Sequence, residues 1–385
     1  MDIFLYTASA RSVLGLIGAL AISTAFAASP AFSNQTVEEI EHIQLAALVD
    51  EAKHPRQPLV LPYREARQSS WALALDNDIL AATKRDQDYT YGFNFTYTGS
   101  AAKESWLSLD HPLSAVDQLL GIGHLSREGI NSHSIEIGMF GFTPEDTKIV
   151  VPNLQDRPYA SLIYLSSSRE QLNLSEQVSW KTTLTLGVLG LGWVGDFQNE
   201  IHDILGATEA RGWDNQISAG GELTARYSVA RQQLLGTLFE NTEIKSTLQA
   251  SIGYLTEASW SLSLRSGNYH TAWSSFNPDL ASYGEKSTYN SSASAMRENY
   301  FWGGAAVKLR AYNAFLQGQF RNSEVTYGAD DLNPVVMEAW LGYTLAFTEG
   351  FRISYVVRGH TSEIKTGAGN RNLVWGGIIL SKVFP

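Results

Sequence analysis

The sequence lacks cysteine altogether, which removes one means of stabilisation and one class of metal site. Disulfide bonds cannot form, so an exported form must be stabilised by packing or by a closed hydrogen-bonded sheet. A zinc site closed by thiolates is excluded for the same reason. Cleavage of a leader after Ala27 would place Ala28 first, so we expect no lipid-modified cysteine at the new amino terminus.

The signatures of several enzyme classes are also missing. There is no G-x-S-x-G nucleophile elbow, which marks serine hydrolases of the α/β type. There is no H-E-x-x-H zinc motif, and no glycine-rich phosphate loop is followed by Lys and then Ser or Thr. Hydrolytic chemistry would therefore have to come from another arrangement of side chains.

Long apolar runs are missing beyond the amino terminus. Residues 13–26 form a short apolar segment that ends in an Ala-Phe-Ala cleavage site, so we predict a signal peptide over 1–27. After it, no run approaches the roughly 20 apolar residues that a transmembrane helix needs. Residues 28–69 are charged and partly helical in spacing, and we interpret them as a periplasmic extension before the main domain.

Charge is scarce as well, because only 17% of the residues are charged. Aromatic residues make up 11% of the chain, and glycine occurs at 32 positions. The mean hydropathy is nevertheless only −0.13. That combination favours a membrane β-barrel, in which residues facing lipid alternate with residues facing a polar lumen. The alternative is a soluble secreted all-β protein. The net charge of −11 argues against nucleic acid as a partner.

Alternation of period two dominates from residue 70 onward. In 90–98, four aromatic side chains share one face of the strand and small polar residues share the other, as expected between lipid and lumen. An even number of strands brings both ends of a barrel to the periplasmic side. We predict an all-β fold, a transmembrane antiparallel barrel of about twelve strands over 70–385. The predicted strands are 70–76, 90–98, 133–143, 158–170, 178–190, 217–230, 244–256, 258–268, 300–313, 335–349, 351–363 and 372–384.

Two predicted connections, 101–132 and 269–299, are long. By strand counting both fall at the periplasmic end, where turns are normally short. They are therefore either real insertions or the result of a miscounted strand.

The stretch 187–206 begins as a strand, breaks at glycines and continues as a short helix in the third connection of the opposite end. Asp196 is a suitable N-cap for this helix and Gly206 a suitable residue just past its end. Phe197 and residues 201 and 204 recur at helical spacing and form an apolar stripe.

His202 is the one histidine of eight that lies on a predicted helix with polar neighbours at helical spacing. Gln198 is four residues before it and Asn199 three, so all three share one side of the helix. A lone histidine is more often a solvated surface residue than a catalyst. A second polar cluster at the same end of the barrel makes His202 a candidate for chemistry.

That second cluster is Asp76, Asn77 and Asp78, at the outer end of the first predicted strand. Alternation predicts that both aspartates share the inward face with Thr90 of the returning strand. Clustered oxygen ligands suit Ca²⁺, which takes six to eight oxygens. The alternative is a polar loop whose Asx side chains make turns.

Asp156 and Arg157 in the next connection lie side by side in the sequence and have suitable charges for an ion pair. We interpret this connection as a structural rim.

At these residues the chain resembles the outer-membrane lipid A 3′-O-deacylase family. Each motif is weak alone, but the set occurs in the family's order over about 150 residues. The motifs are Asn77-Asp78, Asp88-Tyr89-Thr90-x-Gly92, Asp156-Arg157-Pro158-Tyr159-Ala160, Gly187-Val188-x-Gly190, Gln198-Asn199-x-x-His202-x-x-x-Gly206 and Gly212-Trp213-Asp214-x-Gln216.

The resemblance implies a twelve-stranded barrel with an active site at its extracellular end, between the wall and the loop helix. It implies a Ca²⁺-dependent hydrolase of the 3′-linked acyloxyacyl chain of lipid A. His202 matches the family's catalytic histidine, and Asn77, Asp78 and Thr90 match further essential positions. The family's glutamate aligns with Thr208 without gaps, or with Glu209 after a shift of one residue. A basic residue of the family falls near Lys148.

The hypothesis that follows is ester hydrolysis by water, with His202 as general base held by Gln198 or Asn199. Ca²⁺ bound by Asp78 and Asn77 would polarise the ester carbonyl. Trp213 and the apolar stripe would cover acyl chains.

We expect a monomer in the bacterial outer membrane with lipopolysaccharide as its partner. The alternatives are an outer-membrane phospholipase and a non-enzymatic porin or adhesion barrel.

Overall fold

The structure is a computed structural model in which part of the chain is described. The described residues are 64–65, 69–81, 88–122, 129–205, 209–283, 285–286 and 297–384. The predicted signal peptide and nearly all of the predicted amino-terminal extension lie outside these residues, so both stay predictions.

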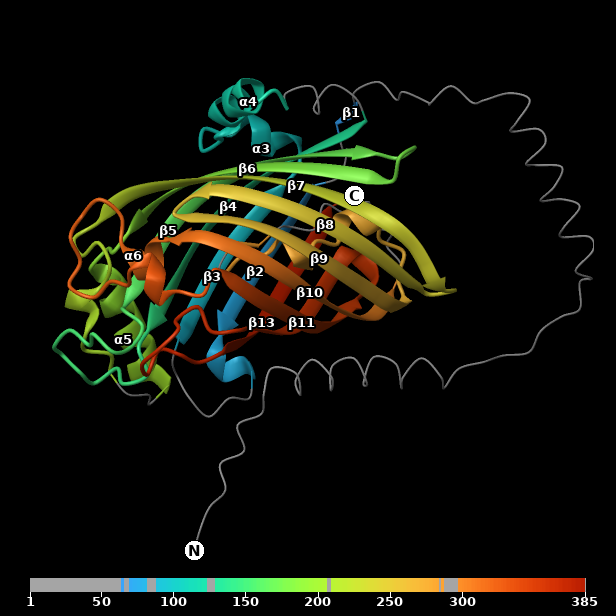
Figure 1. Cartoon of the computed structure of the whole chain (residues 1–385). Helices are drawn as coiled ribbons and strands as arrows, with labels where there is room; N and C mark the ends of the chain where they lie inside the picture. Colours follow the sequence, from blue (N-terminus) through green and yellow to red (C-terminus); the bar gives the residue numbers. More distant parts are fainter. Residues whose placement is uncertain are drawn as a thin grey trace, which may run out of the picture. The chain divides into compact units, whose positions relative to one another are not determined.

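Twelve antiparallel strands form one closed barrel (Figure 1). Consecutive strands pair from β2 to β13, and β13 pairs back with β2 to complete the ring. A short β1 pairs in parallel with the first two residues of β4, Ile130 and Asn131. The strands are β1 (Arg64–Glu65), β2 (Ser69–Asn77), β3 (Asp88–Thr98), β4 (Ile130–Thr143), β5 (Ala160–Asn173), β6 (Val178–Leu189), β7 (Glu222–Phe239), β8 (Thr242–Gly253), β9 (Leu255–Asn268), β10 (Glu298–Asn313), β11 (Val335–Ala346), β12 (Phe351–His360) and β13 (Leu373–Phe384).

The predicted fold is therefore confirmed, and every predicted barrel strand overlaps a real one. The largest difference is the predicted strand 217–230, which is Glu222–Phe239 in the structure. Residues 217–220 form a turn instead, with positive φ at Ser218 and at Gly220.

The helices lie in the connections between strands. They are η1 (Asp78–Ala81), α3 (Ser100–Glu104), α4 (Asp110–Leu119), α5 (Trp193–Leu205), η3 (Trp213–Asn215), η4 (Trp273–Ser275), η5 (Pro278–Leu280), α6 (Ala314–Gln317), η6 (Ala329–Asp331) and η7 (Thr348–Gly350). None of the helices in the described part of the chain is long and apolar enough to span a membrane.

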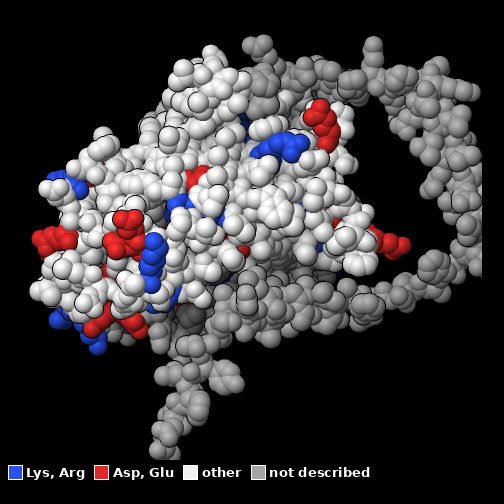
Figure 2. All heavy atoms as spheres, in the orientation of Figure 1, with Lys and Arg blue, Asp and Glu red and all other residues white. Residues whose placement is uncertain are grey.

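The two ends of the barrel differ. One end, here called the loop end, carries α5, α6 and most of the long connections. The other, the turn end, carries the carboxyl terminus, the tight turns at 174–177 and 240–241, and the two long connections that were predicted there. Figure 2 shows charged side chains gathered over the loop end, beside a largely uncharged band of wall.

The first long connection folds onto the outer face of the wall. Leu113 of α4 packs with Leu184 and Tyr227, which face outward on β6 and β7. Asp110 of α4 pairs with Arg169 on the outer face of β5 at 2.8 Å. This helix therefore covers polar wall positions that would otherwise face lipid.

The second long connection enters the lumen. Phe276 packs inside the barrel against Trp302 of β10, with ring centroids 5.2 Å apart. Farther along, Tyr283 packs against Phe142 of β4, with centroids 4.9 Å apart. We call the described residues 269–283 and 285–286 the lumen plug.

Candidate functional site

The wall at the loop end of β2 and β3 holds the predicted oxygen cluster. Ala72, Ala74 and Asp76 are buried on the lumen side of β2, whereas Leu75 is 43% exposed on the outer side. By alternation, Asn77 is on the outer side with Leu75. It is the last residue of its strand, and Asp78 begins the η1 turn.

Thr90 occupies a β-bulge, because the ladder between β3 and β4 shifts register between Tyr89 and Tyr91. Its hydroxyl pairs with that of Thr143 at 2.5 Å. Thr143 has the outward parity of Gly141 rather than the lumen parity of Phe142. The prediction that Thr90 faces inward is wrong, since the extra residue of a bulge changes the alternation of side chains.

The predicted pairing of two aspartates on one inward face is also wrong. Asp76 faces the lumen, where its carboxylate accepts from the Tyr89 hydroxyl at 3.3 Å and pairs with Lys286 of the lumen plug. Asp78 belongs to η1, so it no longer follows the alternation of β2. The predicted cluster is therefore divided between the two faces of the wall.

Asn77 connects the two strand ends. Its Nδ2 donates to the Thr90 carbonyl at 2.5 Å, and its Oδ1 accepts from the Ile79 amide at 2.7 Å. The second contact is an Asx turn, the arrangement that the alternative interpretation of this loop predicted. Asp78 is 2% exposed beside it. The result is a rigid corner made of oxygen and amide groups.

Helix α5 begins at Trp193, so the predicted N-cap at Asp196 is wrong, and Asp196 lies within its first turn. Gly195 lies in the first turn of α5, where the helix packs against Trp213. A Cβ on Gly195 would lie 2.7 Å from the Trp213 ring, so only glycine lets the first turn pack this closely. The acidic Asp196 still suits the positive end of the helix dipole.

Trp213 anchors α5 to the wall. Its indole Nε1 donates to Gln198 Oε1 at 2.8 Å. Its ring packs against Tyr159 and, at a centroid distance of 6.5 Å, against Tyr91 on the outer face of β3. Helix α5 therefore lies on the outer face, the side that carries Asn77 and Thr90.

Phe197 of the apolar stripe does not face the wall, and the side chains of residues 201 and 204 are outside the described residues. Val194 and Gln198 are buried, four residues apart on the packed side of α5, whereas Trp193 is 51% exposed and Phe197 38%. Because α5 lies outside the barrel, Phe197 is open to the surroundings of the protein. That position suits the contact with acyl chains predicted for Phe197 and its neighbours, whereas Trp213 is buried beneath the helix.

His202 lies in the last turn of α5, and the position of its imidazole is outside the described residues, as are Gly206 and Thr208. Asn199, predicted to hold the imidazole, uses both side-chain atoms on the backbone of Ala210, at 2.8 and 3.0 Å. It therefore fastens the chain that leaves the helix.

The two less certain matches to the family lie at the surface. Glu209 is exposed and pairs with Arg211 at 2.9 Å. Lys148 is exposed in the loop between β4 and β5, where its amide donates to Asp146.

A buried charge network closes the loop end. Arg157 pairs with Glu363 at 2.5 Å, and Asp156 pairs with Arg371 at 2.5 Å. The predicted ion pair between Asp156 and Arg157 is wrong, because each has its partner in the connection between β12 and β13. The predicted structural rim is confirmed. Burial alone would raise the pKa of Glu363, but Arg157 and Arg310 outweigh burial and hold that pKa well below its ordinary value.

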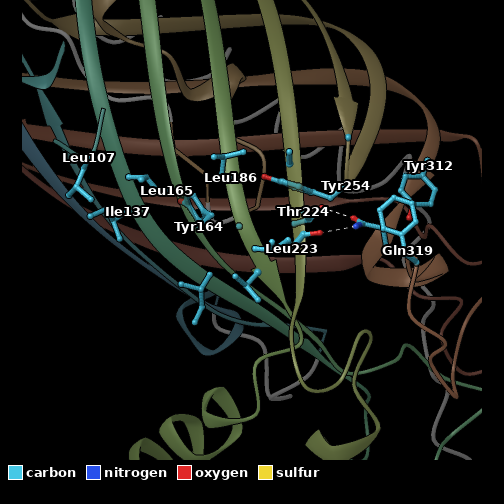
Figure 3. Close-up of a pocket in the computed structure, with 16 residues that line it drawn as sticks. Leu107, Ile137, Tyr164, Leu165, Leu186, Leu223, Thr224, Tyr254, Tyr312 and Gln319 are labelled. Atoms are coloured by element: carbon cyan, nitrogen blue, oxygen red, sulfur yellow. Dashed lines mark hydrogen bonds between the residues drawn. The ribbon is translucent and has the colours of Figure 1, made fainter. Parts of the chain in front are cut away.

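An apolar groove of about 1020 Å³ runs over the outer wall beside this site (Figure 3). Ile137, Leu165 and Leu186 line it as neighbours on three successive strands. Ile163 lines it too and also packs on the cluster around Trp213, so groove and site are continuous.

The groove has a built border at the loop end. Gln319 accepts from Thr224 at 2.6 Å and donates to the Leu223 carbonyl at 3.0 Å, as the dashed lines in Figure 3 mark. Leu107, from the connection outside the wall, lines the groove as well.

The donor groups of the corner are suited in kind to a hard cation. Asp78, Asn77 and Thr90 offer only oxygen ligands, as Ca²⁺ prefers. Among the described residues, no group of three or more His, Asp or Glu side chains is arranged to hold a metal ion. A cation at Asp78 would therefore need water, substrate oxygens or residues outside the described part to complete its shell.

Comparison with known proteins decides the family. The sequence model of the family described as outer membrane protein LpxR matches residues 20–384. The chain belongs to the LpxR family. It is thus a bacterial outer-membrane protein. A search among curated proteins finds no match.

The chain also aligns with solved structures, and the first of them supports the barrel fold. LpxR from Salmonella typhimurium superposes with a TM-score of 0.63 at 16% identity, covering 82% of this chain and 100% of that chain. The KdgM porin covers 82% of this chain and 99% of its own at 5% identity, with a TM-score of 0.35. The translocator domain of NalP from Neisseria meningitidis covers 90% and 96% at 8% identity, with a TM-score of 0.34.

Sequence reasoning missed two residues of this site. Thr143 pairs with Thr90, and Tyr91 carries the contact to Trp213. Both lie next to the bulge at Thr90, and alternation alone gives no sign of a bulge. The Thr-Pro that ends the predicted strand 133–143 was the available signal for Thr143.

Proposed function

We propose that this LpxR-family protein is a hydrolase that removes the 3′-linked acyloxyacyl chain of lipid A. One observation supports it above the others. Asn77, Thr90 and the helix that carries His202 are on the outer side of the wall, and the packing under that helix is continuous with an apolar groove. A lipid held in the membrane reaches an outer-face site without entering the lumen.

In the proposed reaction, water attacks the carbonyl carbon of the ester that joins the acyl chain to the sugar. His202 takes a proton from that water and later returns it to the sugar oxygen as the carbon–oxygen bond breaks. The products are a free carboxylic acid and a sugar hydroxyl.

Asn77 and Thr90 would stabilise the oxyanion. One Nδ2 hydrogen of Asn77 is used on the Thr90 carbonyl, and the second remains for the substrate. If Thr143 donates within the hydroxyl pair, the Thr90 hydrogen is available as a second donor. Two such donors aimed at a developing charge act as an oxyanion hole.

Asp78 and Asn77 are the residues that would hold Ca²⁺, with Asp78 as the charged ligand. When bound, the ion supplies a Lewis acid near the ester carbonyl. Three further residues remain proposed as supporting groups. Gln198 would support the helix that carries His202, and Glu209 and Lys148 would serve the outer end of the site.

The groove is the proposed seat for acyl chains. Its outward positions would exchange contact with membrane lipid for contact with the substrate. Specific affinity would therefore come from shape and from the site next to it, because hydrocarbon is transferred between two apolar environments.

The lumen plug favours an enzyme over the porin alternative. Tyr283 belongs to a buried aromatic cluster inside the barrel, together with Phe142 of β4, Phe315 of α6 and Trp375 of β13. A side chain in this position obstructs a water-filled path. The phospholipase alternative has no observation of its own in its favour.

A three-way assay on the purified, refolded protein tests the proposal. We expect mass spectrometry to show lipid A lighter by one acyloxyacyl unit. We expect no fatty acid from phosphatidylethanolamine vesicles and no stepwise conductance in planar bilayers. Excess chelator should stop the reaction, and Ca²⁺ should restore it better than Mg²⁺. Phospholipid cleavage with unchanged lipid A would refute the substrate, and conductance without acyl release would refute the enzyme.

A further inference from the structure

We propose that the lumen plug positions the candidate active site from the inner face of the wall, with Lys286 as the positioning residue. This inference rests on the proposed function and adds a residue to it. It also gives a role to the connection 269–297, whose described part the reaction itself does not use.

Lys286 lies at the tip of the plug, directly behind the site. Its Nζ pairs with the Asp76 carboxylate, and its backbone amide donates to Glu136 Oε1 at 2.9 Å. Asp76 also accepts from Tyr89, one residue before Thr90. The contacts of Lys286 thus reach β2 and β4 and, through Asp76, β3, the three strands that form the wall at the site.

The inner and outer contacts alternate along the same backbone. Asp76 is held from inside by Lys286, while the next residue, Asn77, is held from outside by Thr90. Neighbouring strand residues face opposite sides of the wall but share one backbone. A shift of Asp76 on the inner side must therefore move Asn77 and Asp78 as well. Lys286 therefore acts on the site through one peptide unit rather than by touching substrate.

The tip itself is built as a rigid support. Ser282 and Glu285 form a two-way backbone bridge, at 3.0 and 3.1 Å. Tyr283 within this turn has φ +49°, in the left-handed region that a bulky side chain rarely adopts. Such strain persists where the surroundings over-determine it. Here Tyr283 donates to Glu363 at 2.9 Å, and Glu285 pairs with Arg226 at 2.5 Å on the opposite wall.

The base of the plug has a separate anchor that provides a matched control. Lys245 of β8 pairs with Asp279 at 3.0 Å and bonds Asn277. Lys245 is buried, and its ion pair and hydrogen bonds within the described part of the chain go to residues of the plug rather than to β2 or β3. Loss of Lys245 should loosen the plug without altering the wall behind Asn77.

The experiment compares Lys286→Met with Lys245→Met in the full-length, refolded protein. We expect Lys286→Met to lower kcat for lipid A by roughly tenfold to a hundredfold with KM unchanged, the effect of a small misplacement of catalytic groups. Lys286→Arg should restore most of kcat, because guanidinium can pair with Asp76. Lys245→Met should keep kcat within about twofold while it lowers the unfolding midpoint.

Hydrogen exchange provides a readout that does not depend on activity. We expect faster exchange in peptides that contain residues 77–81 for Lys286→Met and no change there for Lys245→Met. Asp76→Asn, which removes the same ion pair from the other side, should reproduce both effects if Lys286→Met does not fold.

The outcomes separate two failures. If wild type releases no acyl chain, the proposed function fails, and hydrogen exchange alone decides the inference. Equal effects of the two Met variants on exchange and kcat, or unchanged values in Lys286→Met, would overturn the positioning role.

Discussion

The two faces of the wall formed by β2, β3 and β4 carry different kinds of side chains, although the same strands supply both. The outer face bears Asn77 and Thr90 beside an apolar groove. The inner face bears Asp76, Tyr89 and Glu136, which are bonded to the plug or to each other. Under the proposed function, neighbouring residues of one strand serve chemistry on the outer side and support on the inner side.

This difference explains why a barrel suits a reaction on a membrane lipid. In the proposed reaction the substrate comes from the membrane, and the proposed reactive groups are accordingly on the outer face. Rigidity comes from the lumen, where buried ion pairs and aromatic rings replace a water-filled channel. Apart from Asp76 and Lys286, which hold the wall directly behind the site, changes to the inner face should therefore reduce stability, and changes to the outer face should reduce activity.

The largest effect expected on the inner side is that of Arg157→Met. Arg157 is 1% exposed, and its loss leaves Glu363 and Asp88 with less compensation. Breaking a buried pair of this kind costs about 3–5 kcal/mol. Urea unfolding of the refolded barrel should show this loss, while kcat of the folded fraction stays near that of wild type. A stable variant with low kcat would contradict the division between the faces.

We expect Trp213→Phe to have a smaller effect, and to lower activity rather than stability. The ring stays packed, but the N–H that Gln198 Oε1 accepts is removed. A hydrogen bond of this sort contributes about 1 kcal/mol, so we expect roughly a fivefold loss of kcat/KM with the barrel's unfolding midpoint unchanged. Trp260→Phe, which removes the indole hydrogen bond to Ser246 at an exposed position of β9, is the control and should leave kcat/KM at the wild-type value.

The smallest effect is a dependence of stability on pH. The folded pKa of Glu363 is depressed below its unfolded value of about 4.3. Its contribution is therefore complete above about pH 5 and decreases as the pH falls through the unfolded value toward the folded pKa. Unfolding midpoints between about pH 6 and pH 3 should fall more steeply for wild type than for Glu363→Gln. Parallel curves would rule out this role for Glu363.

Much of the fold was predictable, because alternation repeats along every strand. The aromatic row of 90–98 and the even strand count sufficed for the barrel and for the end that carries each connection. The route of a connection was not predictable. The connection after β3 lies outside the wall and the one after β9 lies inside, and this choice depends on partners such as Arg169 and Asp76 from distant strands.

The site was predictable in its members but not in its geometry. Asn77, Asp78 and Thr90 were named from local chemistry, and the structure brings Asn77 and Thr90 together. The side on which Thr90 lies was missed, since the bulge there reverses the parity and nothing local marks it. The partner of Trp213 was missed too, because a contact between a loop and the wall leaves no period in the sequence.

The most direct test of the account is lipid A mass spectrometry on cells that produce wild type or His202→Ala at equal levels. We predict that wild type removes one acyloxyacyl unit and that His202→Ala, still heat-modifiable as a folded barrel, loses roughly 10²–10⁴-fold of that activity. Lipid A that is processed equally by both proteins, or by neither, would contradict an outer-face active site served by His202.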